Sequence, residues 1–248
     1  TWTFSLAILM LGLSAGFLGS FAEKIGPKKS GLIAMLFWVT GLLGTAYALS
    51  IHNLTLLYLF YGIIGGIGLG IGYITPVSTL VKYFPNRPGF ATGLAIMGFG
   101  FASLIAGPLM QYLVAQVGLV DTFIILGVIY LVIMGASSLY LKAPQPKHST
   151  RTSKDRSTMY VHTHGMLAND AMKTWQFGAL WWVFFINITC GIGLLSLASP
   201  MAQEAIGMTP TAAASLVGII GIFNGGGRIA WSTISDYLGR AQTYILFF

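Results

Sequence analysis

Charged side chains are scarce in this sequence. Of the 248 residues, 8% are Asp, Glu, Lys or Arg, whereas soluble globular domains hold about 25%. Hydrophobic residues make up 55% of the chain, and the mean hydropathy is +0.78. This composition excludes a soluble domain and predicts an integral membrane protein. The net charge of +7 does not indicate a nucleic-acid partner, because the basic residues lie in short clusters between apolar runs.

Cysteine and histidine are also rare. The single cysteine, Cys190, lies within an apolar run, which excludes a disulfide within the chain and favours a packing role. His162 and His164 form the one close histidine pair, which is a weak metal motif, so we predict no metal and no cofactor. A membrane enzyme or sensor would need His, Asp or Glu clustered near one face. The sequence has no such cluster, so we expect no enzymatic activity.

Long apolar runs make up most of the chain. Each has the roughly 20 residues that a helix needs to cross a bilayer. The sequence therefore predicts an all-α, polytopic membrane protein, with seven crossings and the start of an eighth at 243–248. The seven runs are 2–21, 32–50, 54–80, 90–115, 122–141, 175–198 and 212–234.

Basic residues occur in alternate loops between these runs. They follow the first, third, fifth and seventh runs, and the loops between contain no Lys or Arg. By the positive-inside rule the basic loops are cytoplasmic, so the chain starts on the outer side. We expect a multi-pass protein of the inner or plasma membrane. A chain that starts outside without a leader, and stops partway into an eighth run, is expected to be part of a longer protein.

The first and last basic loops repeat one pattern. The first reads GSFAEKIGPKK and the last STISDYLGRA, and aligning Glu23 with Asp236 also aligns Gly26 with Gly239. Repeats of equal orientation, six helices apart, predict two six-helix halves. We therefore expect an N-terminal bundle at 1–141, a cytoplasmic linker at 142–173 and a partial C-terminal bundle at 174–248.

The first loop resembles the G-x-x-x-D-[RK]-x-G-R-[RK] signature of the major facilitator superfamily. Glu23 replaces the usual Asp, and Pro27 the usual Arg. The resemblance implies two six-helix bundles, of which this chain holds helices two to eight and the start of nine. It also implies that the two repeated loops latch the cytoplasmic side. The predicted gating residues are Gly19, Glu23, Lys24, Gly26, Lys28, Asp236, Gly239 and Arg240.

Two longer runs, 70–100 and 199–236, resemble the oxalate/formate antiporter branch of that superfamily, which is related to monocarboxylate transporters. In that branch an Arg in helix eight binds the substrate carboxylate, and the loop acid follows eight residues later. Here the spacing falls on Arg228 and Asp236. The resemblance therefore implies that Arg228 binds a small organic anion.

The chemistry of Arg228 agrees with this implication. Arg228 is the one positive charge inside a long apolar run, and it lies roughly 12 Å deeper than the loop acid on one helix. A charge at that depth is costly and usually faces a water-filled cavity. A guanidinium also grips a carboxylate with two parallel hydrogen bonds. The alternative is that Arg228 pairs with an acid elsewhere, or with backbone carbonyls.

Two further residues are candidates for substrate binding. Tyr73 lies roughly 13 Å from the same membrane surface, where its hydroxyl could meet a substrate oxygen, although an aromatic in a membrane helix also serves plain packing. Asn224 precedes Arg228 by one turn and stands where related proton symporters have Asp. An amide cannot take up a proton, which favours anion exchange over proton symport.

A hinge is predicted in the fourth apolar run. The segment SLIAGP at 103–108 resembles the G-x-x-x-G-P antiporter element of the superfamily, with Ser in the first Gly position. A proline inside a helix predicts a kink. Gly107 and Pro108 are therefore candidate gate-hinge residues.

The sequence thus predicts a secondary transporter that exchanges small organic carboxylates of the oxalate/formate type by alternating access. We expect it to be monomeric when full length and to have the lipid bilayer and a small anion as partners. The alternative within this class is a proton-coupled monocarboxylate symporter, whose proton carrier would lie in helices outside this chain. A membrane enzyme or sensor is the more distant alternative.

Overall fold

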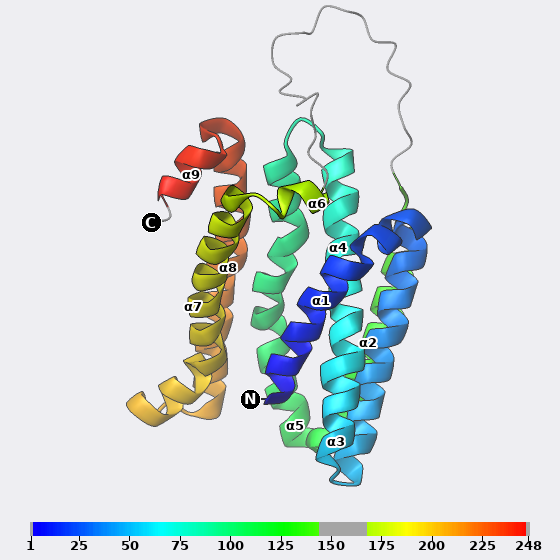
Figure 1. The fold of residues 1–248 in the computed structure, drawn as a ribbon. Coiled ribbons are helices and arrows are strands. Elements are labelled where there is room, and N and C mark those ends of the chain that lie inside the picture. Colours follow the sequence, from blue (N-terminus) through cyan, green and yellow to red (C-terminus); the bar gives the residue numbers. More distant parts are fainter. Residues whose placement is uncertain (1, 144–167, 247–248) are drawn as a thin grey trace, which may run out of the picture. The chain divides into compact units, whose positions relative to one another are not determined.

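The computed structural model describes residues 2–143 and 168–246, and every regular element in these ranges is a helix (Figure 1). The helical character follows from the long apolar runs, since a helix satisfies all backbone polar groups within one segment. The elements are α1 (Trp2–Ile25), α2 (Pro27–Ser50), α3 (Leu54–Leu57), the π-helix η1 (Tyr58–Gly65), α4 (Gly66–Tyr83), α5 (Pro88–Tyr140), α6 (Ala168–Ala171), α7 (Trp175–Ile206), α8 (Pro210–Leu238) and α9 (Arg240–Leu246).

Six helical stretches in the described ranges are long and apolar enough to cross a membrane, counting 54–83 as one stretch. One of them, α5, has 53 residues and would be about 80 Å long if straight, which is far more than one crossing requires. Gly118 interrupts it with φ 81 and ψ 174. We therefore treat α5 as two arms, 88–117 and 119–140, and these arms with the other five stretches give the seven expected crossings.

The break within α5 lies at Gly118, between the predicted crossings 90–115 and 122–141. The kink predicted at Pro108 is a separate expectation. Pro108 lies inside the first arm, and the non-helical backbone in α5 is at Gly118. A positive φ is accessible to glycine without strain, which explains why the chain turns there. The hinge role of Gly107 and Pro108 stays a prediction.

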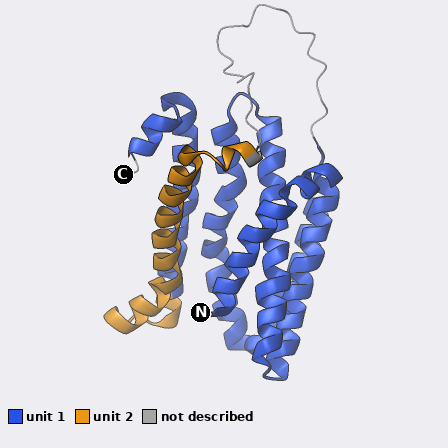
Figure 2. Cartoon of the chain, in the orientation of Figure 1, with its two compact units in different colours: residues 1–144, 214–248 blue, residues 145–213 orange. Residues whose placement is uncertain are grey.

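The chain divides into two compact units (Figure 2). One comprises Thr1–Pro144 and Ala214–Phe248, and the other comprises Gln145–Ala213. The first unit holds α1 to α5, most of α8, and α9, while the second holds α6 and α7. Most of the predicted linker, 142–173, lies outside the described residues, as do His162 and His164. The boundaries 1–141, 142–173 and 174–248 stay predictions.

Within the first unit, α8 crosses the first arm of α5 backbone against backbone. A Cβ on Gly100 would collide with the backbone N and Cα of Gly225. A Cβ on Gly93 would lie 2.7 Å from the carbonyl oxygen of Arg228. Small residues permit such close approach between membrane helices. This crossing sets the position of the side chains described next.

Candidate functional site

Arg228 lies on α8 in the part of the helix that crosses α5. Its side chain is half-buried, and its Nε–H donates a hydrogen bond of 2.9 Å to Oδ1 of Asn224, one turn earlier. A guanidinium has five N–H donors in a planar fork. Asn224 engages Nε, whereas the two terminal nitrogens form the other edge of the fork.

The partner of Arg228 is neutral. The ion pairs found in the described ranges join Glu23 to Lys82, Asp170 to Lys173 and Asp236 to Arg240. Arg228 belongs to none of these pairs, so its charge is not cancelled by an acid in this part of the chain. Arg228 is therefore a cation with a neutral partner inside a helix that is long and apolar enough to cross a membrane.

Tyr73 extends from α4 toward the first arm of α5. Its ring meets the ring of Phe99 edge-on, with 5.4 Å between ring centroids and 80° between planes. Such T-shaped pairs are favourable because the positive ring edge meets the negative ring face. The structure thus places Tyr73 by a contact with Phe99, while Arg228 is placed by Asn224.

Phe99 is a residue that the sequence reasoning missed. Its side chain is 47% exposed, and its neighbour Gly100 lies against Asn224 and Gly225, since a Cβ there would be 3.0 Å from the carbonyl carbon of Asn224. Phe99 therefore contacts Tyr73 of α4 and directly precedes the glycine of α5 that lies against α8. The signal that could have found it is the run GFGF at 98–101, which places a ring beside a helix-contact glycine.

Asp236, near the C-terminal end of α8, caps the start of α5. Its carboxylate accepts hydrogen bonds from the backbone N–H groups of Gly89 at 2.9 Å and Phe90 at 2.8 Å. The residue at the N-cap position of α5, Arg87, provides no side-chain cap. A carboxylate there satisfies N–H groups that lack partners within the helix and meets the positive end of its dipole.

Arg240 completes this arrangement. Its terminal nitrogen donates to Asp236 at 2.7 Å, and it also contacts the hydroxyl of Ser235. The side chain of Asp236 is only 8% exposed, so its charge is enclosed by two amides and one guanidinium. On the facing side, the guanidinium of Arg87 lies 5.8 Å from the ring centroid of Tyr237, which is within cation–π range.

The first repeated loop has a different partner. Glu23, at the end of α1, forms an ion pair of 3.1 Å with Lys82 at the end of α4. Gly19 faces α4, since a Cβ there would lie 3.7 Å from Ile74, and Lys24 and Lys28 are exposed. The aligned acids of the two loops therefore have different partners. Glu23 pairs with a lysine side chain, whereas Asp236 caps a helix N-terminus.

The aligned glycines of the two loops have similar positive φ values. Gly26 has φ 83 between α1 and α2, and Gly239 has φ 87 between α8 and α9. Left-handed φ values favour glycine, which is common just after a helix. This agreement supports the repeat that was read from the sequence.

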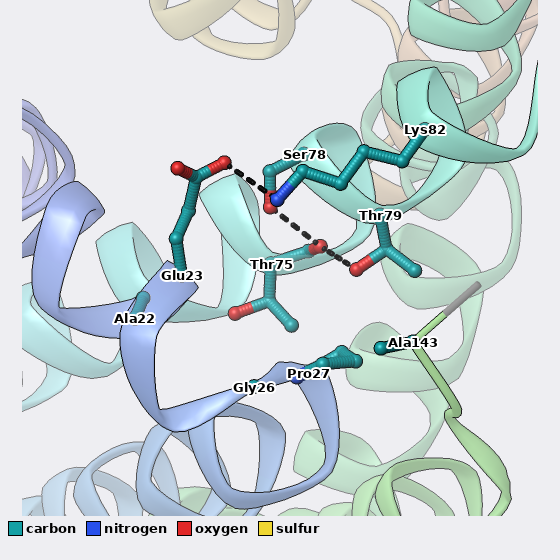
Figure 3. A pocket seen from close by; sticks show the side chains of 9 residues that line it. All are labelled: Ala22, Glu23, Gly26, Pro27, Thr75, Ser78, Thr79, Lys82 and Ala143. Carbon is teal, nitrogen blue, oxygen red and sulfur yellow. Dashed lines mark hydrogen bonds and ion pairs between the residues drawn. The ribbon is translucent and has the colours of Figure 1, made fainter. Parts of the chain in front are cut away.

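A small cavity of about 70 Å³ lies beside the ion pair of the first loop (Figure 3). Hydroxyl groups from α4 line it, and two of them donate to the carbonyl of Thr75, from Ser78 at 3.2 Å and from Thr79 at 2.7 Å. The lining residues are Ala22, Glu23, Gly26, Pro27, Thr75, Ser78, Thr79, Lys82 and Ala143. The cavity belongs to the loop region and not to the neighbourhood of Arg228.

Residues 1–248 match the family model described as Major Facilitator Superfamily. The chain belongs to the major facilitator superfamily. Membership in this superfamily agrees with the all-helical fold and with a multi-pass membrane protein.

In the described ranges no group of three or more His, Cys, Asp or Glu residues could hold a metal ion.

Several proteins of this superfamily are similar to the chain. An uncharacterized MFS-type transporter of Escherichia coli, YhjX, is 31% identical over 243 residues, which cover 96% of the chain and 58% of the relative. The oxalate:formate antiporter of Oxalobacter formigenes is 26% identical over 232 residues, covering 93% and 52%. Human monocarboxylate transporter 14 is 29% identical over 130 residues, covering 52% and 25%. The chain thus spans about half the length of the first two relatives.

Proposed function

We propose that this protein exchanges small organic carboxylates across the membrane by alternating access, and that Arg228 holds the anion. The observation that carries the proposal is a guanidinium within a membrane-crossing helix whose Nε–H is engaged by a neutral amide at 2.9 Å. The similarity to an oxalate:formate antiporter and to a monocarboxylate transporter supports carboxylates as the substrate class.

The proposed binding contact is bidentate and joins the carboxylate of the substrate to the guanidinium of Arg228. The two oxygens of a carboxylate accept hydrogen bonds from the terminal nitrogens of Arg228, which provides both charge and planar geometry. Asn224 fixes the rotation of the guanidinium through Nε. Tyr73 and Phe99 form an aromatic wall on the α4 and α5 side, and the hydroxyl of Tyr73 is a donor for a substrate oxygen.

Exchange is favoured over proton symport by the chemistry of Asn224. A symporter needs a group that gains and loses a proton near the substrate, and an amide does neither. The nearest acid along α8 is Asp236, and its carboxylate is already engaged by two backbone amides and Arg240. The second candidate function is proton-coupled monocarboxylate symport, which the similarity to monocarboxylate transporter 14 favours.

The proposed gate lies at the repeated loops, on the side that the basic residues mark as cytoplasmic. Asp236 holds the start of α5 through its amides, and Arg240 holds Asp236. Gly239 supplies the tight turn before α9, and Gly26 the equivalent turn before α2. Opening toward the cytoplasm would break the contact between Asp236 and α5. The first-loop gating residues Gly19, Glu23, Lys24 and Lys28 would act on the end of α4 through Lys82.

The test is transport by the purified protein in liposomes. Labelled oxalate or formate is added outside, with oxalate, formate or no carboxylate inside. We expect uptake that needs an internal carboxylate and does not respond to an imposed proton gradient. Uptake into empty liposomes that follows the proton gradient would show symport instead.

A further inference from the structure

A second candidate site lies at the ends of α4 and α5, away from Arg228. An open groove of about 380 Å³ is lined by Tyr83, Tyr140, Leu141 and Lys142. The hydroxyl of Tyr83 donates a hydrogen bond of 3.0 Å to the carbonyl oxygen of Lys142. This bond joins the last residue of α4 to the chain just beyond α5, so the two helix ends form one surface.

The groove lies at a membrane boundary, because it is built from the final residues of two membrane-crossing stretches. Tyrosine is enriched at such boundaries, where its ring meets the hydrocarbon edge and its hydroxyl meets water. Both tyrosine side chains of the groove are exposed, and the ammonium-bearing residue Lys142 is exposed as well. The groove therefore offers hydroxyl and ammonium donors at headgroup level.

The charge around the groove is positive. α2 begins where α5 ends, since a Cβ on Gly31 would lie 3.6 Å from Cδ1 of Leu141. Lys28 and Lys29, in the first turn of α2, are exposed at this end, and the N-terminus of α2 adds the positive end of a helix dipole. Among the described residues, two acids lie at this end and both are paired, Glu23 with Lys82 at 3.1 Å and Asp236 with Arg240 at 2.7 Å.

An apolar strip on α5 leads away from the groove. Its second arm exposes hydrophobic side chains that lie three, four and eleven residues after Val128, and these spacings place them on one helix face. These residues are Val128, Leu131, Val132 and Leu139. The strip ends beside Tyr140, so a ligand with an anionic head at the groove would lay its apolar part along this face.

We propose that this groove binds an anionic phospholipid. The phosphate accepts hydrogen bonds from the ammonium of Lys142 and from the phenol of Tyr140, while an acyl chain covers the strip of α5. Lysines near an anionic membrane surface each add to its attraction. A free phosphate ion would use the donors but not the strip, and for this reason a lipid is the occupant that fits.

The test measures which lipids remain on the purified protein. The protein is equilibrated in nanodiscs with equal amounts of phosphatidylglycerol and phosphatidylcholine, and the bound lipids are counted by native mass spectrometry after release. We expect phosphatidylglycerol to be enriched. Lys142→Glu should lower this enrichment at least about fivefold, by the loss and reversal of one boundary charge. Lys173→Glu, the same change in the other unit, should leave it within about twofold of the wild-type value.

Two results would overturn the proposal. One is equal enrichment in Lys142→Glu and Lys173→Glu, with both proteins folded by circular dichroism. The other is displacement of the lipid by inorganic phosphate or by glycerol phosphate as readily as by a diacyl phosphatidylglycerol, which would show a site for free phosphate groups. Displacement by the diacyl lipid alone supports a lipid site.

Discussion

The Nε–H of Arg228 donates to Oδ1 of Asn224 at 2.9 Å, between adjacent turns of α8. This bond changes the role that the sequence suggested for Asn224. We now propose that Asn224 orients the guanidinium and that Arg228 makes the substrate contact. It also leaves the positive charge of the site uncancelled, because an amide carries no charge.

Replacing Asn224 by Asp tests the proposal that a neutral side chain orients Arg228. In Asn224→Asp a carboxylate would pair with Arg228 and compete with the substrate, so carboxylate affinity at neutral pH should fall at least about tenfold, or about 1.4 kcal/mol. The affinity should recover as the pH falls, because protonation of the new carboxyl removes its charge. Asn224→Ala should weaken binding without this pH dependence. Binding is measured by calorimetry, and pH-independent binding by Asn224→Asp would contradict the account.

The contact between Asp236 and α5 predicts a loss of stability on mutation. Asp236→Ala removes the acceptor for two backbone amides and for Arg240, and hydrogen bonds to a charged group contribute about 1.5–3 kcal/mol each. We expect unfolding in detergent to become easier by about 2 kcal/mol or more. Asp170→Ala removes an exposed ion pair with an N–O distance of 3.7 Å and should change stability by less than about 1 kcal/mol. Equal effects of the two changes would argue against the capping role.

The crossing of α5 and α8 predicts a contrast between two glycines of one helix. In Gly100→Ala the new methyl group would collide with the backbone of Gly225, and overpacking of this kind costs about 1–3 kcal/mol. Gly98 has nothing within 4 Å of a Cβ, so Gly98→Ala should be neutral or slightly stabilising. Thermal unfolding of both variants checks this. A similar loss in both would mean that helix flexibility, and not close packing, is what the glycines provide.

The aromatic wall formed by Tyr73 and Phe99 predicts that a change at Phe99 alters the preference for substrate size. Phe99→Ala removes the ring that meets Tyr73 at 5.4 Å and opens space beside Tyr73. We expect the preference for a two-carbon over a four-carbon dicarboxylate to fall about tenfold, which is the range for small differences in fit to an apolar wall. Tyr73→Phe keeps the ring pair and should leave this size preference unchanged. Competition of unlabelled dicarboxylates against labelled oxalate measures this size preference. An unchanged preference in Phe99→Ala would mean that Phe99 does not form the wall.

The sequence predicted the helices well because hydropathy over about 20 residues is a strong signal for a membrane-crossing helix. Helix ends were less predictable. The run at 175–198 continues as α7 to Ile206, through the polar residues Gln203 and Glu204, and ends before Gly207 at φ 69. The hydropathy signal ends with the last apolar residue of the run, whereas the helix continues until a glycine permits a left-handed turn.

Part of the site was also predictable. Residues four apart share a helix face, which placed Asn224 beside Arg228. The partner of Asp236 was not predictable, because the amides of Gly89 and Phe90 are distant in sequence, and backbone donors leave no signature in residue type. Phe99 was missed for a similar reason, since its contact with Tyr73 joins two different helices and leaves no signal in the spacing of residues.

The central claim is tested most directly by replacing Arg228 and measuring exchange of labelled oxalate or formate in liposomes. Arg228→Lys keeps the charge but loses the planar fork and the bond to Asn224, so exchange should fall at least about tenfold. Arg228→Ala should reduce exchange to the level of liposomes without protein, while the variant still folds and retains its bound lipids. Normal exchange by Arg228→Ala would contradict the account.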